Sequence, residues 1–171
     1  MDTIALIRAQ LDEAHGILEQ AVSDLTPDQL HRRLEGSTVN PIAAIYAHTV
    51  TAEDFILNGW VRQQPSIYEA EAWRDRLGVD PGPGFQTEEW GDAVRIEDLP
   101  AFQEYAKAVY ANTDRFVSSL SEADLDPTIS TPLGERTVGN LLGNVIVWHA
   151  MQHGGEISAL KGCMGGKGLP F

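Results

Sequence analysis

Two histidines, four residues apart near the C-terminal end of the chain, could bind a metal ion together. His149 and His153 lie in the apolar segment Val147–Ile157, which reads VWHAMQHGGEI. In a helix of 3.6 residues per turn, both imidazoles would point from one face and could reach a single ion. Apolar residues continue that face, so we expect the pair to point toward the interior of a helical bundle. An isolated pair of this kind is also compatible with one core histidine and one surface histidine.

A third histidine, His48, favours the metal interpretation. It follows Asn40 and Pro41, which predict a helix start with Asn as the cap and Pro at the first helical position. His48 falls on the apolar stripe of that helix, so it too should face the interior. Burying three unpartnered imidazoles costs of the order of 1 kcal/mol or more each. A shared ion would remove most of that cost, and we therefore expect His48, His149 and His153 to bind one divalent metal.

The ligand set predicts the kind of ion and the kind of site. Neutral imidazoles suit Zn, Ni or Fe(II), and three of them leave at least one coordination position open, as in catalytic sites. Such an ion can lower the pKa of bound water toward about 7 or activate a thiol. Two other metal architectures are excluded. No glutamate lies three residues before any of these histidines, as a ferritin-like di-iron bundle requires, and Ala150 replaces the glutamate of an H-E-x-x-H motif.

On these residues the chain resembles the DinB-like (DinB/YfiT) superfamily of four-helix-bundle metalloenzymes. In that family, a histidine on the second helix joins an H-x-x-x-H pair on the fourth, which an R-G-Q-like turn follows. The matching positions in this chain are His48, His149 and His153. Gly155 matches the turn, whereas Gly154 and Glu156 replace the commoner Arg and Gln. The resemblance covers residues 4 to 161. It implies the fold, the metal ligands, a homodimer, and transferase or isomerase chemistry that uses a low-molecular-weight thiol.

Further polar residues could support such a site. Glu156 lies three residues after His153 and could orient that ligand or a bound water from outside the coordination shell. Asn144 and Gln152 lie near the same face of the helix and could form hydrogen bonds with a substrate. No residue is assigned a catalytic role beyond these candidates.

The remaining polar candidates are expected to lie outside the site. Glu53 and Asp54 follow His48 by five and six residues, which takes them off its face of the helix and predicts exposure to solvent. His15 borders the apolar stripe of the first helix and is the alternative metal ligand if His48 is not one. His31 lies in the polar segment LHRRLEG and is expected to be exposed.

Four helices must position these residues. Apolar residues recur three and four positions apart in four segments, which predict helices over 3–23, 41–62, 100–120 and 137–161. Short capped turns follow the first and third helices, at 25–30 and 120–125, so the chain should consist of two related helical halves. No other segment alternates convincingly as a strand. We therefore expect an all-α fold, a four-helix bundle in a single domain spanning residues 1–171.

The second and third helices are joined by a long crossover at residues 63–99. It contains a segment with helical character, SIYEAEAWRDRLG, and a segment rich in turn residues. Its aromatic residues, Tyr68, Trp73, Phe85 and Trp90, either cover the bundle or form a wall of a pocket above the metal. Residues 162–171 form a glycine-rich tail beyond the last helix, in which we expect no role for Cys163.

Composition excludes several classes of function. The net charge of −13 repels phosphate backbones and anionic lipids, so neither nucleic acid nor a membrane surface is an expected partner. No apolar run approaches the roughly 18 residues that a membrane span needs. A single cysteine cannot form an intramolecular disulfide. The N-terminal segment lacks the pattern of a secretory signal, and we expect a cytoplasmic protein.

Two functional classes follow from these features. In the first, the chain is a divalent-metal-dependent enzyme, a transferase or isomerase that uses a thiol such as mycothiol, bacillithiol or glutathione. In the second, it is a metal-stabilised stress-response or small-molecule-binding protein without turnover. Solvent access to the ion separates the two, because a catalytic site needs a path to the open coordination position.

Overall fold

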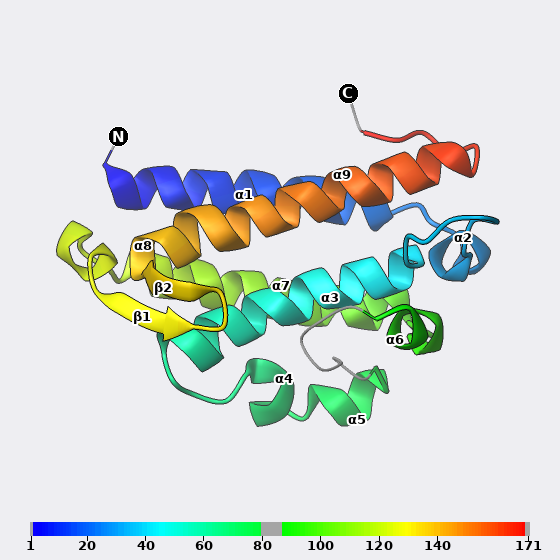
Figure 1. Cartoon of the computed structure of the whole chain (residues 1–171). Helices are drawn as coiled ribbons and strands as arrows, with labels where there is room; N and C mark the ends of the chain where they lie inside the picture. The colour runs from blue at the N-terminus through cyan, green and yellow to red at the C-terminus, as the bar shows by residue number, and fades with distance from the viewer. Residues whose placement is uncertain (1, 80–86, 170–171) are drawn as a thin grey trace.

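Four long helical segments form a bundle in the computed structural model, which describes residues 2–79 and 87–169 (Figure 1). The first three are α1 (Thr3–Val22), α3 (Ile42–Asp54) with its π-helical extension η1 (Phe55–Val61), and α7 (Leu99–Ser118). The fourth begins with α8 (Val138–Asn140) and continues through the π-helix η3 (Leu141–Ile146) into α9 (Val147–Cys163). The predicted all-α four-helix bundle is confirmed. The last helix continues past the predicted end at residue 161 and ends at Cys163, whose side chain is exposed.

Side-chain caps fix where two of the long helices begin. The carboxylate of Asp2 accepts a hydrogen bond from the backbone of Ala5, and that of Asp98 accepts one from Ala101. These bonds satisfy backbone N–H groups that have no partner within the helix. The predicted cap of α3 is wrong, however. Pro41 occupies the cap position without a side-chain bond, because the side chain of Asn40 is engaged elsewhere.

Both predicted capped turns are present. The helix α2 (Pro27–His31) opens with a reciprocal capping box, in which the Thr26 hydroxyl and the side chain of Gln29 each bond to the other residue's backbone. The short helix η2 (Glu122–Leu125) opens in the same way, with Ser121 and Asp124. Each turn follows a long helix and precedes a histidine-bearing one, as expected for two related halves.

A small hairpin departs from the expected strand-free chain. The strands β1 (Thr128–Thr131) and β2 (Gly134–Thr137) pair antiparallel, with Thr128 opposite Thr137. Gly134 adopts a φ of +89°, which a side chain would strain. Each strand has four mostly exposed residues, too few for an apolar alternation to predict it.

The histidine-bearing helix α3 is the most deeply buried element. It packs against α9, α7 and α2, and eleven of its thirteen residues are buried. Among them are Ala43, Ala44 and Ala47, whose small side chains let neighbouring helices approach closely. The aromatic rings of Tyr46, Phe102 and Tyr105 fill the adjoining core. In the described part of the chain, no helix is both long enough and apolar enough to cross a membrane.

The crossover covers the bundle with its aromatic side chains. It contains the short helices α4 (Ile67–Ala70), α5 (Trp73–Leu77) and α6 (Glu88–Ala93). Tyr68 and Trp73 are buried in the main core, and Trp90 packs against it. The covering interpretation is therefore confirmed for these residues, whereas Phe85 lies outside the described part of the chain.

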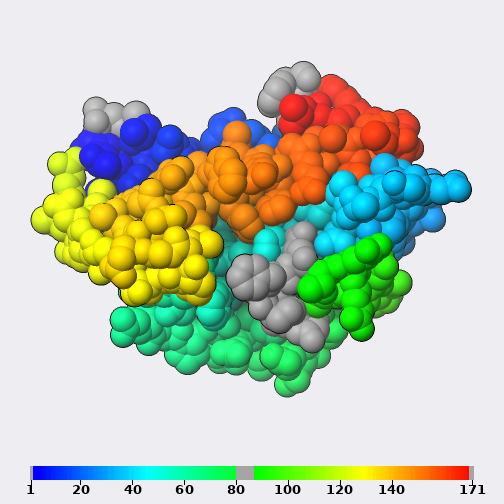
Figure 2. All heavy atoms as spheres, in the orientation of Figure 1, coloured from blue at the N-terminus to red at the C-terminus, as the bar shows by residue number. Residues whose placement is uncertain are grey.

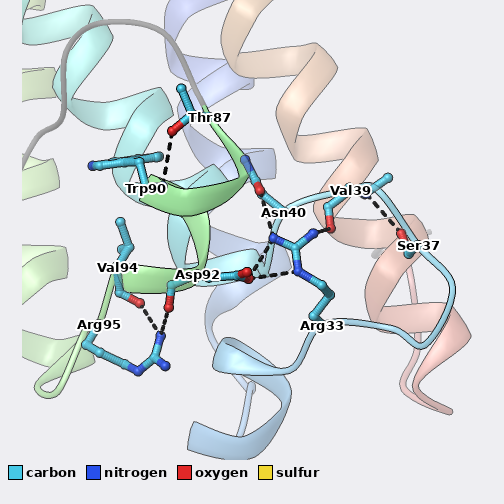
Figure 3. Close-up of polar contacts among 9 residues, drawn as sticks. All are labelled: Arg33, Ser37, Val39, Asn40, Thr87, Trp90, Asp92, Val94 and Arg95. Atoms are coloured by element: carbon cyan, nitrogen blue, oxygen red, sulfur yellow. Dashed lines mark hydrogen bonds and ion pairs between the residues drawn. The ribbon is translucent and has the colours of Figure 1, made fainter.

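Two polar contacts fasten the crossover to the bundle. The buried carboxylate of Asp54 accepts hydrogen bonds from the backbones of Ile67 and Tyr68, both 3.0 Å long, at the start of α4. At the other end, the guanidinium of Arg33 reaches both Asp92 of α6 and Asn40 (Figure 3). The first contact holds α4 against the end of α3, and the second ties α6 to the segment that precedes α3.

Candidate metal centre

The structure brings His48 of α3 together with His149 and His153 of α9. One ligand atom from each of the three residues lies within 4.8 Å of the others, and the Nε2 atoms of His48 and His149 are 3.0 Å apart. The ring centroids are separated by 4.6 to 5.4 Å, with the rings steeply inclined to one another. Although His48 lies 101 residues from His149 in the sequence, the three imidazoles thus converge edge-on upon one point.

Close packing against α1 positions the helix α9, which carries His149 and His153. At Gly154, the residue after His153, an added Cβ atom would lie 3.3 Å from the side chain of Ile17 in α1. A larger residue would push α9 away from α1. The space-filling view shows α3, in cyan, recessed between orange α9 and the yellow hairpin (Figure 2). The cluster therefore lies between two packed helices rather than on an outer surface.

The surroundings keep two of the imidazoles neutral. Burial, followed by the charge of His153, lowers the pKa of His48 from 6.5 to about 4, although the nearby carboxylate of Glu156 opposes this. Burial, followed by the charges of His153 and His48, lowers the pKa of His149 to about 3. Both rings are therefore uncharged at neutral pH, which is the form that binds metals.

Glu156 orients the third imidazole. Its Oε2 atom lies 2.7 Å from Nδ1 of His153, one helical turn earlier on α9. A carboxylate at that position accepts a hydrogen bond from the Nδ1–H group, which leaves the lone pair of the neutral ring on Nε2. The side chain of His153 is 15% exposed and that of Glu156 34% exposed, so the cluster is not sealed from solvent.

The donor set fits a divalent ion. Two nitrogens that each bind zinc at about 2.0–2.1 Å in a tetrahedral arrangement lie about 3.3 Å apart, close to the separation of the His48 and His149 Nε2 atoms. Without an ion, the Nε2–H group of one of these two neutral rings must donate a hydrogen bond to Nε2 of the other. Imidazole ligands suit Zn, Ni and Fe(II) alike, so the side chains favour a divalent ion without selecting one.

The predicted exposure of the two acidic residues after His48 is wrong. Glu53 and Asp54 were expected to face solvent, but they are 3% and 0% exposed. Because α3 is surrounded by other helices, it has no solvated side on which to place them. Glu53 bonds to His15 and Thr113 in the α1–α7 part of the bundle, and Asp54 holds the crossover.

The other polar candidates lie apart from the histidine cluster or remain on the surface. His15 is buried and paired with Glu53, so it is not grouped with the three histidines. His31 was expected to be exposed but is only half-buried, with Nδ1 bonded to the Pro27 carbonyl and Nε2 accepting the backbone N–H of Ile96. Asn144 and Gln152 are both exposed.

Sequence reasoning missed the buried pair formed by His15 and Glu53. The available signal was weak, because the two residues lie 38 positions apart on different helices. A histidine and a glutamate on the inner faces of neighbouring helices could have predicted such a pair. The order in which the helices pack was needed to identify the partner.

Comparisons with known proteins agree with this fold. Residues 10–157 match the sequence model of the DinB superfamily. The structure is similar to the crystal structure of a conserved protein from Enterococcus faecalis, with a TM-score of 0.81 and 16% sequence identity over 94% of this chain and 96% of that one. A comparison with curated proteins gave no match. Because the superfamily match covers most of the sequence, the chain belongs to the DinB superfamily.

Proposed function

We propose that the chain is a divalent-metal-dependent enzyme with His48, His149 and His153 as the metal ligands. The convergence of three imidazoles, two of them held neutral by burial, is the observation that carries this proposal. A protein without a metal would gain nothing from placing three such groups edge-on within 4.8 Å. The carboxylate on His153 is a further feature shared with many metal–histidine sites.

Each residue has a defined task in this proposal. His48 and His149 supply neutral nitrogens from opposite helices, and His153 supplies a third that Glu156 orients. A bound divalent ion would supply Lewis acidity, which favours the deprotonated form of a water or thiol. Glu156 is also placed to hold a proton near the site, because its carboxylate is partly exposed.

We further propose a transferase or isomerase reaction with a low-molecular-weight thiol as one substrate. Membership of the DinB superfamily supports this choice, through the resemblance that links the three histidines to thiol chemistry. The partial exposure of His153 and Glu156 favours turnover over a sealed, purely structural ion, because a substrate needs access to the open coordination position.

The proposal is tested by metal analysis followed by a conjugation screen. The chelator-treated protein would be reloaded with zinc, nickel or iron and incubated with an electrophile and mycothiol, bacillithiol or glutathione. We expect thiol consumption that needs both the metal and His153. Metal binding without turnover for any of the thiols would contradict the enzymatic part and favour a metal-stabilised binding protein.

We also propose a cytoplasmic homodimer. The crossover residues Tyr68 and Trp73 are buried in their own chain and therefore do not offer a surface for the contact. Trp148 and Phe55, which are 60% and 53% exposed, are better candidates for an interface. Light scattering at tens of micromolar should give twice the chain mass, and a monomeric mass would contradict the proposal.

A further inference from the structure

A second histidine with an adjoining carboxylate lies at the contact of α1 with α7. Nε2 of His15 is 2.8 Å from Oε2 of Glu53, and the other oxygen of that carboxylate accepts a 2.6 Å bond from the Thr113 hydroxyl. The ring of Tyr110 stacks on the imidazole at 3.8 Å and 15°. The imidazole is thus fixed in position by one hydrogen bond and one stacked ring.

The free nitrogen of this imidazole faces an open pocket. His15 is 91% buried, yet it lines a surface pocket of about 330 Å³ together with Leu11, Gly16, Tyr110 and Ala111. Nε2 is occupied by Glu53, and no hydrogen bond of Nδ1 is found among the described residues; since Nδ1 is not a fully buried atom either, it is the nitrogen left for the pocket. In a neutral imidazole, a carboxylate at Nε2 places the single proton there, which leaves a lone pair on Nδ1.

The charged residues around the pocket favour a cation. Arg8 is neutralised by Asp114, to which it bonds at 2.7 and 3.1 Å. Asp12 is exposed and makes no ion pair within the described part of the chain. Glu19 accepts hydrogen bonds from Tyr46, Tyr110 and Gln103 and carries a second carboxylate of the lining. The pocket therefore has an excess of negative charge beside an unused acceptor.

We propose that this pocket binds a small organic ammonium ion, whose N–H group donates to Nδ1 of His15. Asp12 and Glu19 balance its charge, and its carbon chain lies against Leu11 and Ala111. A metal ion fits less well, because within the described residues only the other three histidines bring three potential ligand atoms together. An anion would be repelled by the acidic lining.

This site is separate from the proposed metal centre. Glu53 bonds to His15 and Thr113, and neither His15 nor Glu53 belongs to the group of potential ligands formed by the other three histidines. Binding of the ammonium ion should therefore persist when the metal is removed. A failure of the metal proposal would leave this one intact, and the reverse also holds.

The test is a titration of the full-length protein with n-butylammonium, followed by the ¹⁵N resonances of His15. Before the titration, the proton should be on Nε2, and Nδ1 should have the shift of an unprotonated nitrogen. We expect a saturable change at Nδ1 with butylammonium and none with n-butanol or butyrate. Comparison with the His15→Gln variant assigns the resonance among the five histidines.

Two conservative variants serve as a matched pair, and neither removes a core contact. Asp12→Asn should weaken butylammonium binding about two- to fivefold, as expected for one exposed charge. Glu13→Gln changes the neighbouring exposed residue, which does not line the pocket, and should leave binding unchanged. A proton on Nδ1, an equal response to butanol, no saturable change, or equal effects of the two variants would each overturn the proposal.

Discussion

His153 and Glu156 form a hydrogen-bonded pair within one turn of α9, with 2.7 Å between Nδ1 and Oε2. The pair turns the other ring nitrogen of His153 toward His48 and His149 without adding a fourth protein ligand. Glu156 stands where the DinB-like motif more commonly has a glutamine. The substitution adds a negative charge beside the proposed ion, and this charge can be tested separately from the ligands.

Removing the charge of Glu156 should weaken metal binding. Glu156→Gln keeps an oxygen that can accept a hydrogen bond from Nδ1–H, so we expect an affinity loss of about tenfold, and about 100-fold for Glu156→Ala. Competition with a chromophoric chelator measures both. Glu13→Gln, which removes an exposed charge on α1, is the control. Unchanged affinity in Glu156→Ala would exclude an orienting role for this residue.

The metal-free protein should lose stability as the pH falls from about 6.5 to about 4. Burial lowers the pKa values of His48 and His149 to about 4 and about 3, so below pH 6.5 the unfolded chain binds protons that the folded chain does not. Above pH 6.5, neither state binds them and the contribution vanishes. The loss between pH 7 and pH 5 should be of the order of 1–2 kcal/mol per histidine.

Urea unfolding with a chelator present measures this pH dependence. His149→Gln should show a smaller loss than the wild type between pH 7 and pH 5, because one titrating group is gone. Identical losses in the two proteins would show that the neutral form of His149 contributes nothing to the pH dependence.

Asp54→Asn should strongly destabilise the fold. The carboxylate accepts hydrogen bonds from two backbone N–H groups, from Asn58 and from the Tyr105 hydroxyl, whereas an amide would place its own N–H group against one of these donors. We expect a loss of about 3 kcal/mol or more in the free energy of unfolding. Asp12→Asn is the exposed control and should change stability by less than about 0.5 kcal/mol. A similar effect of both variants would contradict the fastening role of Asp54.

Two glycine-to-alanine substitutions should have opposite signs. At Gly91, an added Cβ atom would lie 2.2 Å from Oδ1 of Asn40 and would disturb the contact of that side chain with Arg33. We expect destabilisation by about 1–3 kcal/mol. At Gly16, in the middle of α1, nothing lies within 4 Å, so alanine should stabilise by up to about 1 kcal/mol. Thermal unfolding distinguishes the two, and a stabilising Gly91→Ala would contradict the close approach of α6.

The sequence predicted the long helices and the convergence of the histidines, because both depend on a 3.6-residue period. His149 and His153 are linked by spacing alone, and His48 joins them because it lies on an apolar face. The same reasoning failed for Glu53 and Asp54, since a one-sided stripe assumes a solvated opposite face that α3 lacks. The hairpin offered no signal, because its strands are short and exposed.

Side-chain pairs between different helices could not be predicted from the sequence either. The bond between His15 and Glu53 depends on how α1 packs against α3, and no local pattern encodes that contact. Likewise, Asn40 was expected to cap its own helix, but its side chain instead accepts a hydrogen bond from Arg33 and lies close to Gly91. Local propensity was therefore overridden where a tertiary contact used the same side chain.

The most direct test of the account is the stoichiometry of metal binding in the wild type and in the single variants His48→Ala, His149→Ala and His153→Ala. Chelator-treated protein would be titrated with zinc by calorimetry, with circular dichroism to verify that each variant is folded. The account predicts one ion per chain for the wild type and for Gln152→Ala, an exposed control on the same helix. It predicts no stoichiometric binding for any of the three histidine variants. Wild-type affinity in the variants, or no binding by the wild type, would contradict it.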